Sequence, residues 1–90
     1  IIDIYHHLHD SGCKVDVYDP WVSQETALNE FGIEIIPFPE KGGYDGIIIA
    51  VGHNEFRNMG CAAVREFGAA DHILYDLKYI FKQSDVDLRL

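Results

Sequence analysis

The sequence predicts an α/β fold in which a parallel sheet is covered by helices on both faces, making three layers. Segments with helical spacing alternate with short β-rich segments, which is the order that right-handed βαβ crossovers require. Residues 46–52, GIIIAVG, are apolar on both faces of a strand, as in the centre of a parallel sheet. The first predicted helix has no strand before it. We therefore expect that the innermost strand lies outside this chain, which we interpret as a fragment of a longer protein.

The first predicted helix is short and is followed by a strand. Apolar residues at positions 1, 4, 5 and 8 fall at helical spacing, and Gly12 is placed to end that helix. Residues 14–18 predict a strand with alternating valines. Pro20 ends this strand, because proline has no N–H to donate to a ladder.

A second helix is predicted between residues 23 and 32. Ser23 suits the N-cap and Gly32 the C-cap. Leu28 and Phe31 are expected to form its inner face, and the apolar residues 33–36 follow as a short extended piece.

The second half of the chain predicts one more crossover. A helix starts near Asn54, is broken by Gly60 and is expected to bury one face. A strand follows at residues 72–77, and residues 79–81 begin a last short helix or turn. This order is that of a Rossmann-like fold without its first strand. The residues expected on the buried helix face are Phe56, Met59, Ala63, Val64 and Phe67.

The composition predicts one small acidic domain, residues 1–90. Fifteen acidic residues against seven basic ones give a net charge of −8. This balance argues against nucleic acid as a partner, but one small anion could be held by one or two local cations. The longest apolar run, residues 47–51, is too short to span a membrane. Cys13 and Cys61 have no CxxC spacing, so we expect reduced thiols and a cytoplasmic protein.

Two polar residues, His53 and Lys78, directly follow predicted strands in the second half of the chain. Ligands of open α/β sheets bind at the carboxyl ends of the strands. Lys78 is one of seven basic residues and stands where an anion would bind, although a surface lysine is the simpler interpretation. His53 has no Ser or Cys near it in sequence that it could activate, so both a ligand contact and a purely structural role stay open.

Asp19 ends the predicted strand at 14–18, where dinucleotide-binding folds carry an acid that binds a ribose. No G-x-G-x-x-G segment precedes it. Asp-Pro is also a common pair at the end of a strand, where the carboxylate accepts hydrogen bonds from nearby backbone N–H groups. We interpret Asp19 as a turn residue.

His6, His7, His9 and Cys13 resemble a metal-binding cluster. His6, His9 and Cys13 could share one helix face, and zinc accepts such ligands. Cys13 lies beyond the helix, however, and is expected to point inward as a small apolar residue. A solvated histidine cluster without metal is our interpretation.

Three segments taken together resemble one family: VDVYDP at 15–20, YDGIIIAVGHNEF at 44–56 and ILYDLK at 73–78. They are similar to the C-terminal domain of the UDP-glucose/GDP-mannose dehydrogenase family, and the closing VDLRL is similar to that family's C-terminal end. AVGHNEF and Lys78 look more like the UDP-N-acetylhexosamine branch. UDP-glucose enzymes more often have Trp at position 53 and Asp-Gly-Arg at 76–78.

The resemblance implies the UDP-sugar-binding domain of an NAD-dependent nucleotide-sugar 6-dehydrogenase in polysaccharide precursor synthesis. Such enzymes oxidise a sugar C6 alcohol to a carboxylate in two hydride transfers, through a cysteine-bound intermediate. The NAD-binding domain, the catalytic cysteine and a long dimerisation helix would lie outside this chain. We therefore expect no catalytic, cofactor or metal ligands here, an inactive fragment, and a homo-oligomeric parent enzyme without nucleic-acid or membrane partners.

The resemblance places one substrate contact in this chain. The family's basic residue after the last strand corresponds to Lys78, and we expect Tyr79 and His53 beside it at the UDP-sugar site. Tyr79 departs from the pattern, because the branch usually has glycine there. The alternatives are a non-catalytic Rossmann-like interaction module and a receiver-type switch. The receiver needs acids at its strand ends, which Val51-Gly52-His53 does not supply.

Overall fold

The structure, a computed structural model, describes residues 2–89 and divides into two compact units. The first unit is Ile1–Pro39 and the second is Glu40–Leu90. The second unit contains a parallel sheet with helices in its crossover, so the predicted α/β class is confirmed. Among residues 2–89, no helix has the length and apolar character that crossing a membrane requires.

The first unit contains the two predicted helices, α1 (Ile2–Asp10) and α2 (Gln24–Phe31). The predicted cap of α2 is confirmed, because the Ser23 hydroxyl accepts a hydrogen bond of 3.1 Å from the Thr26 N–H. Gly32 ends the helix in the left-handed conformation.

The strand predicted at residues 14–18 is wrong. Only an isolated parallel bridge between Val17 and Ile35 forms there, with the Ile36 N–H donating to the Val17 carbonyl at 2.8 Å. Alternating valines favour an extended chain, but a strand needs a partner over several residues, and within this unit the pairing stops after one. Cys13 is exposed and not inward-pointing, because no pleated ladder fixes its direction.

The inner face of α2 also differs from the prediction. Ala27 and the following Ile33 are buried, whereas Leu28 is 48% exposed and Phe31 is 46% exposed. A helix of eight residues presents a narrow face. Within this unit, the small side chain of Ala27 is buried and the larger side chains of Leu28 and Phe31 are not.

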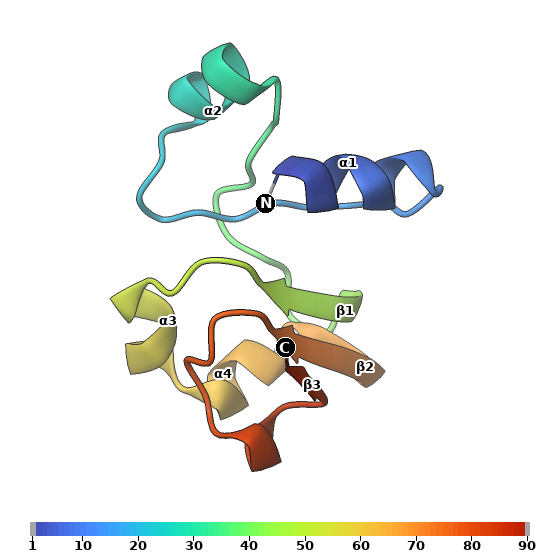
Figure 1. The fold of residues 1–90 in the computed structure, drawn as a ribbon, viewed down its shortest axis with the longest axis vertical. Coiled ribbons are helices and arrows are strands. Elements are labelled where there is room, and N and C mark those ends of the chain that lie inside the picture. Colours follow the sequence, from blue (N-terminus) through green and yellow to red (C-terminus); the bar gives the residue numbers. More distant parts are fainter. Residues whose placement is uncertain (1, 90) are drawn as a thin grey trace. The chain divides into compact units, whose positions relative to one another are not determined.

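The second unit is built on three parallel strands in the order β1-β2-β3 (Figure 1). They are β1 (Tyr44–Ile49), β2 (Gly68–Asp76) and β3 (Leu88–Arg89). Two short helices, α3 (Asn54–Met59) and α4 (Cys61–Arg65), form the crossover between β1 and β2. The predicted break at Gly60 is confirmed, since this residue has φ of +87°, which glycine adopts without steric cost.

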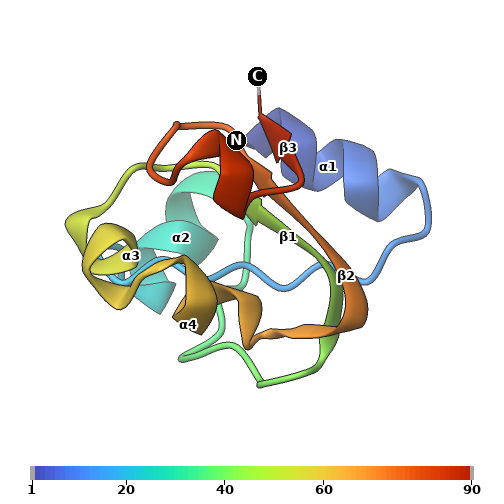
Figure 2. The ribbon, with the colours of Figure 1, turned by 90° about the horizontal axis from the view of Figure 1, so that it is seen from below.

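The core of the second unit lies between α4 and one face of the sheet (Figure 2). Ile49, Val64 and Leu74 form a buried cluster. Of the residues predicted on the buried helix face, Val64 and Phe67 are buried, whereas Phe56, Met59 and Ala63 are only half-buried. The sequence did not predict β3. The last short helical turn lies at Gln83–Asp85 and not at 79–81, which form an irregular segment.

Candidate functional site

The loops that follow β1 and β2 meet at the carboxyl edge of the sheet. The Leu77 N–H donates to the Ile49 carbonyl at 3.0 Å, which joins the two strand ends. A Cβ built on Gly52 would lie 3.5 Å from Cγ2 of Ile80 and 3.8 Å from Cβ of Lys78. The two loops therefore lie close together at Gly52, and Lys78 lies beside the segment that carries His53.

Asp76 fixes the loop that carries Lys78. It is the last residue of β2, and none of its surface is exposed. One carboxylate oxygen accepts the Lys78 N–H at 3.1 Å, and the other accepts the Phe81 N–H at 2.9 Å. These two bonds satisfy the buried acid and set the path of residues 77–81. The loop is therefore held from inside the fold, while Lys78 itself is exposed.

Tyr79 has the single left-handed non-glycine backbone among residues 2–89, with φ of +55°. Its side chain is 51% exposed, and its ring lies over the Arg89 guanidinium, 4.1 Å from the ring centroid. Arg89 is in β3, whose carboxyl end lies at the same edge as those of β1 and β2, because all three strands are parallel. The ends of β2 and β3 at this edge are thus accompanied by Lys78 and Arg89.

His53 is half-buried at the start of α3. It is the N-cap residue, but its side chain makes no capping hydrogen bond. Its carbonyl accepts the Phe56 N–H at 3.1 Å, and its ring lies 5.8 Å from the Phe56 ring, measured between centroids. Gly52, the residue before His53, lies beside Lys78, and a contact of His53 with the substrate stays a prediction.

Arg57 is a residue of this edge that sequence reasoning missed. Its Nη1 donates to the Gly52 carbonyl at 2.8 Å and to Oδ1 of Asn54 at 3.3 Å. Its Nη2 would lie 3.4 Å from a Cβ on Gly52. The available signal was a basic residue in the short helix that follows β1, which is ordinarily a solvated helix residue.

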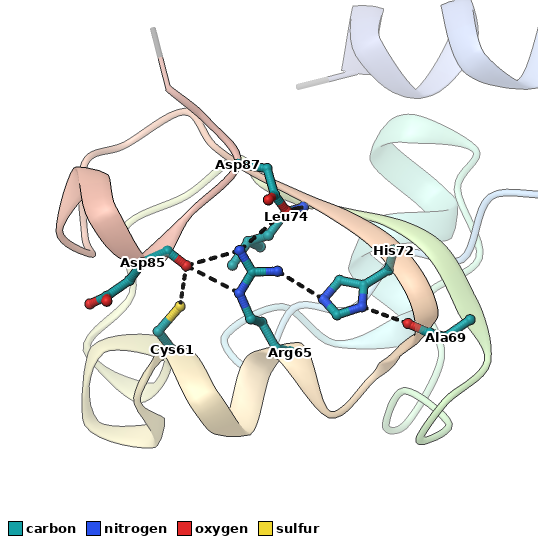
Figure 3. Close-up of polar contacts among 7 residues, drawn as sticks. All are labelled: Cys61, Arg65, Ala69, His72, Leu74, Asp85 and Asp87. Carbon is teal, nitrogen blue, oxygen red and sulfur yellow. Dashed lines mark hydrogen bonds and ion pairs between the residues drawn. The ribbon is translucent and has the colours of Figure 1, made fainter.

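A second polar cluster holds the C-terminal segment against α4 and β2 (Figure 3). Arg65 donates from Nε and Nη2 to the Asp85 carbonyl at 3.1 and 2.9 Å, and its Nη2 lies 3.1 Å from the Asp87 carboxylate. Asp87 also accepts the Leu74 N–H at 2.8 Å. The cluster therefore places β3, and with it Arg89, beside β2.

The same cluster fixes the tautomer of His72 and shifts the pKa values of Asp87 and Cys61. Arg65 can only donate and the Ala69 carbonyl can only accept, so His72 is neutral with its proton on Nδ1. The Leu74 N–H, with help from Arg65, holds the pKa of Asp87 below its ordinary value. Burial raises the pKa of the Cys61 thiol, which donates to the Asp85 carbonyl at 3.3 Å.

Comparison with known proteins identifies the family. A sequence model of the UDP-glucose/GDP-mannose dehydrogenase family, UDP binding domain, matches residues 1–83. The chain belongs to this family. Over its full length it is 50% identical to a UDP-N-acetyl-D-glucosamine 6-dehydrogenase of Pseudomonas aeruginosa and 44% identical to one of Salmonella typhi. It spans about a fifth of each, 21% of their length, and no solved structure matches it.

Membership in the UDP-glucose/GDP-mannose dehydrogenase family gives the backbone at Tyr79 a simple interpretation. The resemblance to the UDP-N-acetylhexosamine branch implies glycine at this position, and glycine adopts positive φ at little cost. This chain keeps the left-handed conformation with a tyrosine. Tyr79 therefore has, with a side chain, a backbone conformation that glycine adopts without steric cost.

The remaining sequence candidates lie in the first unit. One Asp19 carboxylate oxygen accepts the Trp21 N–H at 2.8 Å, which confirms the predicted turn role. Within α1, the His9 ring stacks on Tyr5 with centroids 5.9 Å apart. Residues 2–89 contain no group of three or more His, Cys, Asp or Glu side chains arranged to hold a metal ion.

Proposed function

We propose that this chain is the single UDP-sugar-binding domain of a cytoplasmic, NAD-dependent UDP-N-acetylhexosamine 6-dehydrogenase. UDP-N-acetyl-D-glucosamine is the first candidate substrate, because both relatives are named for it. UDP-N-acetylgalactosamine and UDP-glucose are the next. The observation that carries the proposal is that Lys78 lies beside the Gly52–His53 segment, where the neighbouring parallel strands β1 and β2 end.

This arrangement suits a diphosphate. Lys78 is exposed, and its ammonium group forms no ion pair among the described residues, so its charge is available to an anion. The Asp76 carboxylate fixes the Lys78 backbone, so little order has to be gained when a ligand binds. Tyr79 and His53 flank Lys78 and can line the uridine or sugar part of the ligand. The acidic remainder of the chain disfavours non-specific polyanions.

NAD does not fit this chain, which has no G-x-G-x-x-G segment. We assign NAD, which accepts the hydrides, to the rest of the protein, together with the catalytic cysteine and the contacts that make the enzyme a homo-oligomer. Cys61 is poorly suited to be the nucleophile, because its thiol is engaged by the Asp85 carbonyl and its pKa is raised. The isolated chain is accordingly expected to be inactive.

The function is tested by supplying the full-length protein with NAD and each of the three UDP-sugars. Production of two NADH per uronate, fastest with a UDP-N-acetylhexosamine, is the expected result. UDP binding without NADH formation would contradict the dehydrogenase. No binding of any UDP-sugar would favour a non-catalytic interaction module.

A further inference from the structure

Arg57 is a second cation beside Lys78 at the carboxyl edge of the sheet. We propose that Arg57 is a second phosphate-binding side chain, which forms with Lys78 a two-cation clamp for the diphosphate of the nucleotide sugar. This inference rests on the proposed function and assigns to that site a residue that sequence reasoning did not find.

Geometry is the first argument. Arg57 lies in α3 and Lys78 in the loop after β2, yet both approach Gly52. A Cβ built on Gly52 would lie 3.4 Å from Nη2 of Arg57 and 3.8 Å from Cβ of Lys78. Gly52 has no side chain between Nη2 of Arg57 and Cβ of Lys78. We place the phosphates at this edge of the sheet, where one cation comes from α3 and the other from the loop after β2.

The state of the Arg57 side chain is the second argument. It is exposed but tethered, because Nη1 donates to the Gly52 carbonyl at 2.8 Å and to Asn54 at 3.3 Å. Long exposed side chains ordinarily lose rotamer freedom when they bind a ligand, and this tether has already removed part of that freedom. Among residues 2–89, Arg57 forms no ion pair, whereas Arg65 is paired with Asp87 and Lys41 with Glu66.

Charge is the third argument. The diphosphate of a nucleotide sugar carries two negative charges, one on each phosphate, and Arg57 with Lys78 supplies two positive ones. Arginine presents a planar fork that matches two phosphate oxygens, while lysine acts as a point charge. The pair can therefore neutralise the diphosphate and fix its orientation.

The test is calorimetric titration of the full-length protein with UDP and with uridine, using the variants Arg57→Gln, Arg57→Lys and Lys78→Gln. Lys41→Gln is the matched control, because it removes one positive charge from the turn before β1, at the opposite edge of the sheet. We expect Arg57→Gln and Lys78→Gln each to weaken UDP binding about tenfold or more, as the loss of a charged hydrogen bond does. Uridine binding should change by less than about twofold, and Lys41→Gln should match the unaltered protein.

The outcomes separate the inference from the function on which it rests. Wild-type UDP affinity in Arg57→Gln, together with weakened binding in Lys78→Gln, would overturn the clamp and leave the proposed site. Wild-type affinity in both would overturn the site itself. An equal loss of UDP and uridine binding in Arg57→Gln would show that Arg57 only positions the Gly52 loop. Arg57→Lys keeps the charge but not the fork, so partial recovery of UDP affinity supports the clamp. Hydrogen exchange of a peptide that covers β2 (Gly68–Asp76) reports whether this domain is folded in each variant.

Discussion

Replacement of Tyr79 tests the backbone of the loop that presents Lys78. A non-glycine residue in the left-handed region costs about 1–2 kcal/mol, and Tyr79 has φ of +55°. Its ring recovers about 0.5–1 kcal/mol by stacking on Arg89, 4.1 Å away. In Tyr79→Ala the strain stays and the stacking is lost. In Tyr79→Gly the strain is removed, at a cost of about 0.5–1 kcal/mol in backbone entropy.

The balance predicts that Tyr79→Gly is about 0.5–1 kcal/mol more stable than Tyr79→Ala against local opening, and close to the unaltered protein. At a position with negative φ the alanine variant would be the more stable of the two. Hydrogen exchange of the peptide 77–82 in the full-length protein measures this opening. The peptide contains the Lys78 and Phe81 N–H groups, which donate hydrogen bonds to the Asp76 carboxylate.

We expect this peptide to exchange about two to five times more slowly in the glycine variant than in the alanine variant. Equal exchange, or slower exchange in the alanine variant, would refute the left-handed backbone at position 79. It would also remove the link between this loop and the glycine of the family pattern.

Two further predictions concern the acids that organise the sheet edge. Asp76→Asn keeps one acceptor oxygen but turns an amide donor toward a backbone N–H, which costs about 1–3 kcal/mol. Hydrogen exchange at 77–82 should therefore become at least about fivefold faster, and the KM for the UDP-sugar should rise. Unchanged exchange would contradict the role given to Asp76. The folded pKa of Asp87 lies below its ordinary 3.8, so its stabilisation is complete above that value and is lost as pH falls through the folded pKa. Thermal melting should therefore show Asp87→Asn less stable than the unaltered protein at neutral pH, with the gap closing in acid; a gap independent of pH would count against the Leu74 and Arg65 contacts.

The parallel crossover was predictable because its signals are local. Residues 46–52 are apolar on both faces, and Gly60 interrupts the helical spacing where the backbone turns. The strand at 14–18 was overpredicted for a related reason, since alternating valines show that a segment is extended and not whether it has a partner. Residues 88–89 gave no signal, because a two-residue strand is held by contacts of Arg65 with residues twenty or more positions away.

The candidate site was predictable only where position in the fold carried the information. Lys78 and His53 were found because ligands bind after the carboxyl ends of parallel strands. Arg57 could not be found in this way, because a basic residue inside a helix ordinarily faces water. Its tether to the Gly52 carbonyl appears only when the loop and the helix are seen together.

The kinetics of Lys78→Ala in the full-length enzyme test whether Lys78 binds the UDP-sugar. Both KM values are measured under the same conditions, one for the UDP-sugar and one for NAD. We predict a rise of about tenfold in the KM for the UDP-sugar, as expected for one charged contact, with the KM for NAD little changed. An unchanged KM for the UDP-sugar would remove Lys78 from the site and contradict the account.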